Sequence, residues 1–308
     1  MAIHEECGIF GIYNPGGDCA RDTYYGLFAL QHRGQEACGI AAMNERELSV
    51  RKDVGLVGEV FSDADLDALD GVMAIGHVRY ATTGGGGREN AQPLTLKYVK
   101  GSLAVAHNGN LRNTSELKAE YEYKGAIFHT STDSEIIAYI IAQERLKCGS
   151  IEQAVMNAMP RLRGAFSLVV MSSRKLLAAR DPWGFRPLCI GLRGGAYVFA
   201  SESCALDSVG ASFVRDVLPG EVVWVYQGEL HSMRMPDLPK SALCVFEYLY
   251  FARPDSVIDC QSVYDARLLA GRCLAREYPV DADVVIGVPD SGLVAAKGCS
   301  MESGIPYN

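Results

Sequence analysis

Short apolar runs separated by turn residues dominate the first part of the chain. Runs at residues 72–79, 166–171 and 222–226 have the length and the β-branched or aromatic content of buried strands. Four isoleucines between positions 136 and 141 recur at helical spacing instead. Strands, then two helices, then strands again predict an α+β fold of layered sheets with helices on the outside.

Local signals predict where the helices begin and end. The tetrapeptide T-D-S-E at 132–135 has the form of a capping box, and Ser150 with Gln153 opens a further helix that runs to about residue 162. An earlier helix is expected at 21–31, with Gly34 as its C′ residue. The sequence H-N-G-N at 107–110 predicts a turn after a strand at 103–106.

The pattern breaks near residues 233–241, where two prolines stand among polar residues. We place a domain boundary there, with a first domain at 7–235 and a second at 242–308. In the second, 263–277 is predicted to be helical, and 284–288 a buried strand followed by a helix to about residue 302. One βα unit cannot close a core, so we expect this domain to be incomplete, truncated at its C-terminus, and the sequence to be partial.

Composition excludes several classes of protein. The chain has 308 residues, 48% of them hydrophobic, and a net charge of −8, which argues against nucleic-acid binding. No apolar run approaches the ~20 residues of a membrane span. The N-terminus has no secretory-signal pattern. None of the ten cysteines forms a C-x-x-C pair, which argues against a self-contained zinc site and favours a cytoplasmic chain with reduced thiols.

Cys7 is the first candidate for chemistry, at the start of the opening apolar run. A free cysteine is ordinarily a buried packing residue. If residues 1–6 are a leader that is removed on maturation, Cys7 gains a free α-amine, whose pKa lies near ~8. Nucleophile and base would then belong to one residue.

Four polar clusters follow strands or begin a helix, and they contain Arg33, Arg79, Asn108 and Asp133. Singly, each has an ordinary explanation, such as a surface ion pair, a turn or a charge at a helix start. Together with Cys7 they supply the groups that an amidase needs for a substrate with a carboxylate and an ammonium group. Oxyanion donors belong to that set, since losing one typically costs ~10²–10³ in rate.

The sequence also resembles known proteins. C-G-I-F-G-I, L-Q-H-R-G-Q-E-A-C-G-I, G-H-V-R-Y-A-T-T-G, A-H-N-G-N-L and T-S-T-D-S-E resemble the class II glutamine amidotransferase domain, an N-terminal-nucleophile hydrolase. R-D-P-W-G-F-R-P-L, A-S-E-S-C-A-L-D, C-V-F-E-Y-L-Y-F-A-R-P-D-S and V-I-G-V-P-D-S-G narrow the resemblance to the amidophosphoribosyltransferase family. The resemblance implies a four-layer αββα glutaminase domain followed by an α/β phosphoribosyltransferase domain.

The same resemblance implies an activity. The family hydrolyses glutamine and passes ammonia to phosphoribosylpyrophosphate, giving 5-phosphoribosylamine, the first step of de novo purine (IMP) synthesis. By resemblance, Cys7 is the nucleophile, Arg79 binds the glutamine α-carboxylate and Asp133 binds the α-ammonium group. Asn108, through its side chain, and Gly109, through its backbone N–H, form the oxyanion hole. Residues that line the glutamine pocket are Arg33, Tyr80 and Thr82.

Other implied roles belong to the second domain. Tyr264 falls in the ammonia path, and Ser291 matches a magnesium ligand. Cys244 matches the first of four cysteines that hold a [4Fe-4S] cluster, the others lying beyond residue 308; members without the cluster can also keep a cysteine there. No stretch of this sequence fits the family's phosphoribosylpyrophosphate loop. The family also implies a homo-oligomer, a tetramer.

Two alternatives stay open. A class II glutaminase could serve another acceptor domain, such as a sugar-phosphate isomerase or an asparagine- or glutamate-forming domain, although F-A-R-P-D-S and V-P-D-S argue against it. The other alternative is a non-catalytic binding domain whose former active site no longer functions. The presence of every expected site residue argues against it, namely Cys7, Arg79, Asn108, Gly109 and Asp133.

Overall fold

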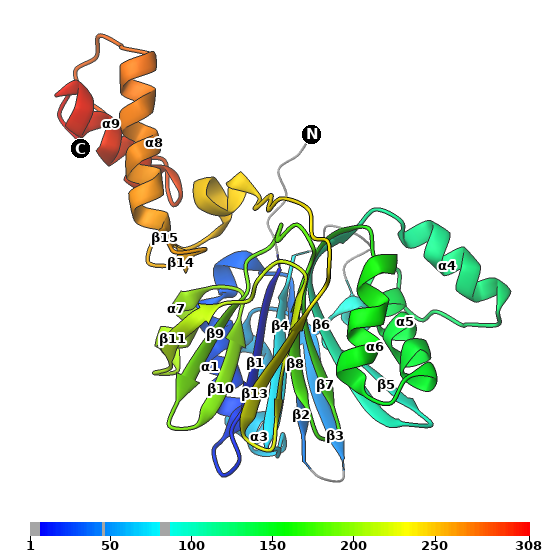
Figure 1. Cartoon of the computed structure of the whole chain (residues 1–308). Coiled ribbons are helices and arrows are strands. Elements are labelled where there is room, and N and C mark those ends of the chain that lie inside the picture. Colours follow the sequence, from blue (N-terminus) through cyan, green and yellow to red (C-terminus); the bar gives the residue numbers. More distant parts are fainter. Residues whose placement is uncertain (1–6, 45–46, 81–86) are drawn as a thin grey trace.

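The computed structural model describes residues 7–44, 47–80 and 87–308. Two β-sheets pack face to face, and helices cover both outer surfaces (Figure 1). The arrangement confirms the predicted four-layer αββα architecture.

The first sheet carries the beginning of the described chain at its centre. Its order is β11 (Ser212–Asp216), β9 (Cys189–Arg193), β10 (Ala196–Ala200), β1 (Gly8–Tyr13), β4 (Met73–Arg79), β2 (Ala37–Met43) and β3 (Leu48–Val54). All neighbours in this sheet are antiparallel. Gly8 of β1 lies opposite Val78 of β4. The residue before β1, Cys7, is thereby brought close to the end of β4.

The second sheet contains a long strand that overturns one expectation. Its order is β13 (Glu229–Arg234), β12 (Glu221–Tyr226), β8 (Leu176–Arg180), β7 (Gly164–Ser172), β6 (Gly101–Leu111) and β5 (Leu94–Tyr98). The turn predicted at 107–110 is wrong: β6 continues through it and pairs with β7 as far as Leu111 opposite Gly164. Asn-Gly is typical of turns, but here the cross-strand pairing outweighs that local preference.

Helices α1 (Cys19–Ala29), α2 (Val57–Val60), α3 (Asp63–Asp67) and α7 (Ser203–Ser208) cover the first sheet. Helices α4 (Thr114–Tyr123), α5 (Ser134–Lys147) and α6 (Ile151–Ala158) cover the second. Short 3-10 turns lie at Gln31–Arg33, Arg88–Asn90 and Met159–Arg161. The Ser150 hydroxyl accepts from the Gln153 N–H, which confirms the predicted start of α6.

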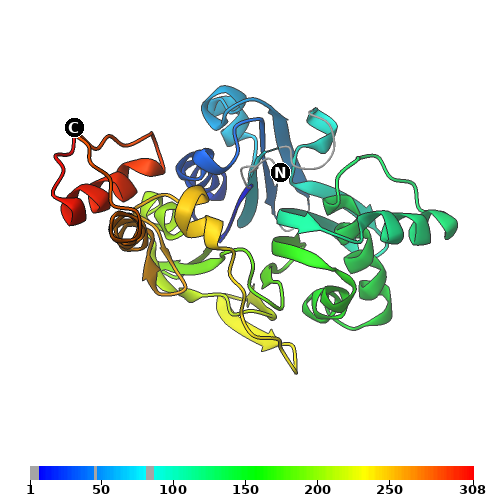
Figure 2. The same ribbon diagram turned by 90° about the horizontal axis from the view of Figure 1, so that it is seen from above.

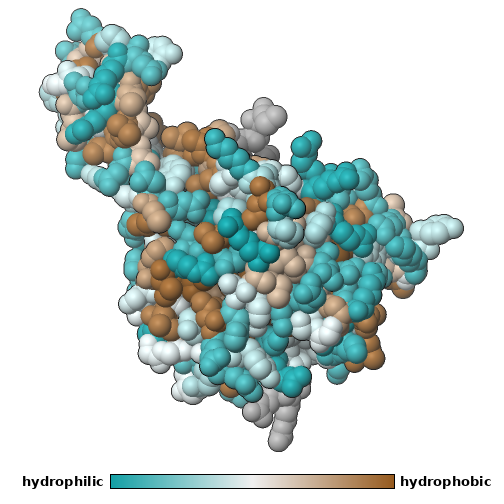
Figure 3. Space-filling view, in the orientation of Figure 1, coloured by the Kyte–Doolittle hydropathy of each residue, from teal (hydrophilic) through white to brown (hydrophobic). Residues whose placement is uncertain are grey.

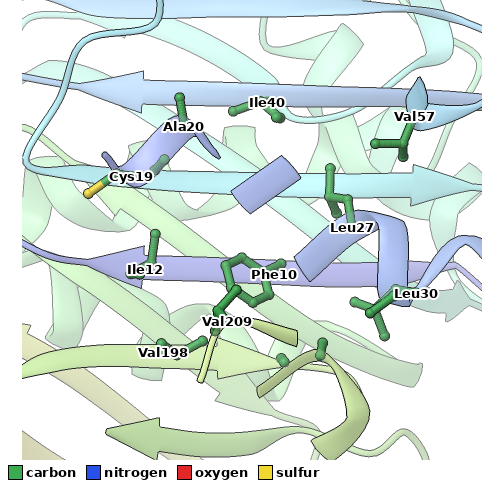
Figure 4. Close-up of a cluster of buried hydrophobic side chains, with 14 of the residues drawn as sticks. Phe10, Ile12, Cys19, Ala20, Leu27, Leu30, Ile40, Val57, Val198 and Val209 are labelled. Carbon is green, nitrogen blue, oxygen red and sulfur yellow. The ribbon is translucent and has the colours of Figure 1, made fainter. Parts of the chain in front are cut away.

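Strand alternation distributes the core into separate apolar layers. On β1, Phe10 and Ile12 point to the helix layer, whereas Ile9 points to the other sheet. Figure 4 shows Phe10 beside Leu27 of α1, in the layer between the first sheet and its helices. Because successive side chains of a strand point to opposite faces, a strand that lies between its helix layer and the other sheet has two buried faces.

Two of the predicted local signals are wrong. Gly34 has φ −157°, which is extended backbone and not the left-handed conformation of a C′ residue. The 132–135 capping box does not form, because Asp133 is the N-cap of α5. The Glu135 carboxylate instead accepts from the backbone N–H groups of His129 and Thr130.

The chain leaves the two sheets after β13 through a linker, residues 235–243, that forms no helix or strand. The chain then forms a π-helical turn (Glu247–Phe251), a small hairpin of β14 (Val257–Ile258) and β15 (Gln261–Ser262), and helices α8 (Val263–Glu277) and α9 (Gly292–Ser303). Figure 2 shows the π-helical turn, in yellow, between the sheets and the C-terminal helices. The predicted helix at 263–277 is confirmed, and no helix in the described ranges is long and apolar enough to cross a membrane.

The buried strand predicted at 284–288 is wrong. In the described residues this segment makes only an isolated bridge, Val285 to Tyr307. Ile286 and Val288 are 67% and 74% exposed. The apolar pattern indicated burial, but no described strand lies alongside to cover it.

Candidate active site

Cys7 lies in a pocket where three of the four polar clusters meet. It is 8% exposed, and its thiol lies 3.6 Å from the carbonyl oxygen of Tyr80, to which it donates. The residues that line this pocket are Cys7, Arg79, Tyr80, Gln92, His107, Gly109, Thr132, Asp133 and Ser134. Segments up to about 127 positions apart in sequence thus converge on one thiol, as the sequence analysis predicted for Cys7, Arg79, Gly109 and Asp133.

Arg79 reaches the pocket because it is the last residue of β4, next to the start of β1. It is 3% exposed, and its Nη1 lies 3.9 Å from a carboxylate oxygen of Glu36. A guanidinium in this position provides forked donors suited to a carboxylate.

Asn108 and Gly109 enter the site on β6. Asn108 is fully buried, and neither atom of its side-chain amide has a hydrogen-bond partner among the residues that the structure describes. Buried polar atoms are nearly always paired, so such an amide points to a use outside the resting fold. Gly109 has φ +142°, and an added Cβ would lie 2.1 Å from the carbonyl oxygen of Ala165. Only glycine fits there.

Asp133 enters the pocket from the start of α5, where it is the N-cap residue. One carboxylate oxygen accepts from the Leu111 N–H at 2.8 Å, and the other lies 3.6 Å from Nδ1 of His107. Burial acts to raise the pKa of Asp133, but His107 and the Leu111 N–H outweigh it and hold the pKa below its ordinary value. Asp133 is therefore a carboxylate at neutral pH.

Further polar residues also line the pocket without a role predicted from the sequence, among them Gln92, His107 and Ser134. Nδ1 of His107 lies 3.1 Å from the Ser134 hydroxyl, and the backbone N–H of His107 donates to the side-chain amide oxygen of Gln92 at 2.8 Å. His77 lies behind them with its Nε2 donating to the His107 carbonyl, and burial lowers its pKa to about 3. His77 and His107 stand inside the two quoted motifs, G-H-V-R and A-H-N-G-N, which is where a signal for them lay.

Arg33 was expected in the same pocket, but it does not line it. Its Nε donates to the backbone carbonyl of Cys7 at 3.0 Å, and its other nitrogens contact Glu202 and Glu247. Arg33 thus lies behind the nucleophile. Thr82, also expected in the pocket, lies outside the described residues.

Comparisons with known proteins agree with this geometry. The glutamine amidotransferase domain family matches residues 77–208. An amidophosphoribosyltransferase of Methanocaldococcus jannaschii is 49% identical over 98% of this chain and 67% of its own length. The chain belongs to the amidophosphoribosyltransferase family.

Other members of the family agree. The Bacillus subtilis amidophosphoribosyltransferase is 46% identical over 99% of this chain and 64% of its own length. A B. subtilis glutamine phosphoribosylpyrophosphate amidotransferase, solved with ADP and GMP, superposes with a TM-score of 0.92 at 45% identity, covering 98% of this chain and 65% of that one. The chain therefore spans about two thirds of the length of these relatives.

The other residues to which the resemblance assigns roles, Ser291, Tyr264 and Cys244, do not line the Cys7 pocket. Ser291 lines a separate cavity of about 300 Å³ that also borders Arg33 and Arg267. The Tyr264 hydroxyl accepts from Nζ of Lys297 at 3.1 Å. Cys244 is half-buried near the linker. Within the described ranges no three His, Cys, Asp or Glu side chains are grouped so as to hold a metal ion.

Proposed function

We propose that this chain hydrolyses glutamine at Cys7 and supplies the ammonia to phosphoribosylpyrophosphate, as the names of its relatives suggest. The observation that carries the proposal is the pocket itself. A thiol, an arginine and an ionised aspartate line it, and the buried, unpartnered amide of Asn108 immediately precedes Gly109 in the same strand.

Glutamine fits the charges of this pocket. The Arg79 guanidinium would pair with the α-carboxylate, and the Asp133 carboxylate would accept from the α-ammonium group. Because Asp133 is also held by the Leu111 N–H, its position is set before the substrate arrives. The two charges fix the amino-acid end, and the side-chain amide then extends to the thiol.

The chemistry requires Cys7 to be the first residue. Its α-amine takes the thiol proton, and the thiolate attacks the side-chain carbonyl carbon of glutamine. Nδ2 of Asn108 and the N–H of Gly109 donate to the oxyanion that forms. The C–N bond of the glutamine amide breaks, the α-ammonium group of Cys7 gives its proton to the leaving nitrogen, and ammonia departs. Water then hydrolyses the thioester to glutamate and restores the thiol.

Formation of 5-phosphoribosylamine, the first step of purine synthesis, is the part of the proposal that rests on the relatives. The magnesium ion expected at Ser291 and the [4Fe-4S] cluster expected at Cys244 remain predictions, and no step above runs through either. The domain limits, the ammonia path at Tyr264 and the tetramer are likewise predictions, the last testable by light scattering.

The glutaminase proposal is tested by labelling with a glutamine-analogue diazoketone. On a chain processed to begin at Cys7, we expect one adduct, on Cys7, together with ammonia release from glutamine. Cys260 is an exposed thiol in the same chain and serves as the internal control, because a reagent that modifies any accessible thiol would label it first. Cys7→Ser should lose both label and ammonia.

Two results would contradict the proposal. One is a processed chain that neither labels nor releases ammonia. The other is a chain that still begins with Met1 and turns over glutamine at the same rate, because its Cys7 has no free amine. The acceptor is tested separately, by phosphoribosylpyrophosphate-dependent product formation in the whole gene product.

A further inference from the structure

Arg33 is a heavily paired buried cation beside the nucleophile. Its side chain is completely buried, and its Nε donates to the Cys7 carbonyl at 3.0 Å. Nη1 and Nη2 donate to the two carboxylate oxygens of Glu247 at 2.9 and 3.0 Å, and Nη1 also donates to Glu202 at 2.5 Å. The planar guanidinium is thus held on two sides by carboxylates while its third donor faces Cys7.

The two carboxylates come from different parts of the chain. Glu202 directly precedes α7 and lies 169 positions from Arg33; Glu247 opens the π-helical turn beyond the linker and lies 214 positions away. Glu202 also accepts from the Ser256 hydroxyl at 2.7 Å and from the Arg253 N–H at 2.9 Å. Both carboxylates therefore connect the first sheet to the segment that follows the linker.

Burying the charges of Arg33, Glu202, Glu247 and the neighbouring Arg186, which also pairs with Glu247, is costly, and hydrophobic residues of similar volume would stabilise a fold as well or better. The cluster is therefore weakly explained by stability alone. Among the described residues, it meets the site at the Cys7 carbonyl, through Nε of Arg33. That carbonyl sets the rotation of residue 7 about its Cα–C bond, and hence where the α-amine and the thiol stand.

This matters most in a processed chain. Chain ends are poorly ordered unless they are tied down. A nucleophile that begins the chain has no preceding peptide to hold it, and β1 starts only at Gly8. A charged donor on the Cys7 carbonyl would supply a fixed point at that end.

We propose that Arg33 is a positioning residue for Cys7 and that Glu247 holds Arg33 in place, so that the geometry of the nucleophile depends on the segment beyond the linker. The inference rests on the proposed glutaminase function. It assigns Arg33 to the nucleophile and not to the glutamine pocket.

The test compares variants of the full chain processed to begin at Cys7. Arg33→Lys keeps the charge but loses the Nε donor, and Glu247→Gln removes one carboxylate charge with little change of shape. For both we expect kcat for ammonia release to fall by about tenfold or more, which equals ~1.4 kcal/mol or more. We expect KM for glutamine to stay within about twofold, because uniform substrate binding is untouched. The double variant should be no slower than the slower single one.

Glu221→Gln is the matched control. Glu221 is also buried, 3% exposed, and its two oxygens accept from both terminal nitrogens of Arg215 at 2.8 Å, but it does not touch Cys7. It should lower the melting temperature like Glu247→Gln and leave kcat unchanged. If Glu247→Gln fails to fold, Glu247→Asp keeps the charge balance and carries the test.

Three outcomes would overturn the inference: wild-type kcat in a folded Arg33→Lys; a raised KM with unchanged kcat, which would place Arg33 on the substrate; or additive effects in the double variant. Absence of ammonia release in the processed wild-type chain would instead contradict the proposed function. The two failures are therefore distinguishable.

Discussion

The two regions on either side of the linker are held together by different forces. Before the linker, three apolar clusters fill the layers of the αββα fold, and Ile9, Phe10 and Phe199 are completely buried. After it, the described cluster of buried apolar residues consists of Ala252, Ile258 and Val263. Figure 3 shows apolar surface on the small C-terminal lobe as well as on the larger body. The first region can bury enough apolar area to be stable; the second, as described, buries little.

The contacts between the regions are largely polar. Arg33 pairs with Glu247, and Arg180 pairs with Asp259 at 2.8 and 3.1 Å. Glu202 accepts from the Arg253 N–H on the other side. Directional ionic contacts can be lost or altered without unfolding either region, whereas a shared apolar core cannot. This difference explains how the nucleophile can lie in the stable region before the linker while its position depends on contacts with the region after the linker.

The largest expected effect tests the asymmetry of the two cores. Phe199→Ala removes a fully buried ring between the sheets, so we expect it to lower the free energy of unfolding by ~3–5 kcal/mol. Leu274→Ala, in α8, changes a side chain that is 55% exposed and should cost less than ~0.5 kcal/mol. Urea unfolding followed by circular dichroism measures both. Equal losses would show that the C-terminal helices share the main core.

The next effect separates chemistry from stability within the first region. Asn108→Ala should lower kcat for glutamine by ~10²–10³, because it removes an oxyanion donor. It should leave the melting temperature nearly unchanged, since the Asn108 amide makes no hydrogen bond to described residues. Asn113→Ala is the control: its amide donates to the Arg161 carbonyl and accepts from the Arg163 N–H. It should lower stability and spare kcat, and the reverse pattern would remove Asn108 from the oxyanion hole.

The sequence predicted the parts of this molecule that local pattern controls. The helix at 263–277 and the strands around Cys7 follow from periodicity, and the motifs pointed to Arg79, Gly109 and Asp133. The turn at 107–110 failed because pairing with β7 outweighs the preference of Asn-Gly. Local propensity decides an element only where tertiary contacts do not.

The position of Arg33 could not be predicted, for a different reason. Its partners lie 169 and 214 positions away, and neither periodicity nor a capping signal connects residues that far apart. The strand expected at 284–288 failed because an apolar run predicts a need for burial and not the neighbour that provides it. The sequence pattern identifies which residues need burial or an ionic partner, and the topology of the fold decides which residues provide it.

The third prediction concerns pH and the ionic contact between the regions. Burial acts to raise the pKa of Glu202, but His32 and Arg33 outweigh it and hold that pKa well below its ordinary value of 4.5. For a carboxylate with a lowered pKa in the folded state, the stabilisation is present above the unfolded-state pKa and is lost as pH falls below it. We expect the free energy of unfolding to decline from about pH 5 downward.

Glu202→Gln isolates this contribution. The variant should be less stable than the wild type at pH 7, and the gap should narrow as the pH is lowered to about 3. Urea midpoints across that range measure it. Glu302→Gln, at an exposed Arg276 pair, should follow the wild-type curve closely. A gap that stays constant with pH would mean that the Glu202 charge does not contribute.

The smallest expected effect comes from Asp259→Asn, which weakens one contact and keeps the rest. Asp259 has φ 45°, a conformation that asparagine also tolerates, so the backbone should not change. Arg180 keeps its bonds to the carbonyls of Gly184, Arg186 and Val217. Because Asp259 is 34% exposed, we expect a loss of ~1 kcal/mol or less, confined to the region after the linker.

Hydrogen exchange read residue by residue separates the regions in this variant. Amides of the β14–β15 hairpin should exchange up to ~5-fold faster, and those of β1 should not change. Asp283→Asn, in the exposed segment before α9, is the control and should alter neither set. If β1 amides accelerate as much as the hairpin, the two regions open as one cooperative unit and the ionic contacts are part of a single fold. If only the hairpin responds, the contact can loosen while the two-sheet core stays closed, which is what a nucleophile governed from across the linker requires.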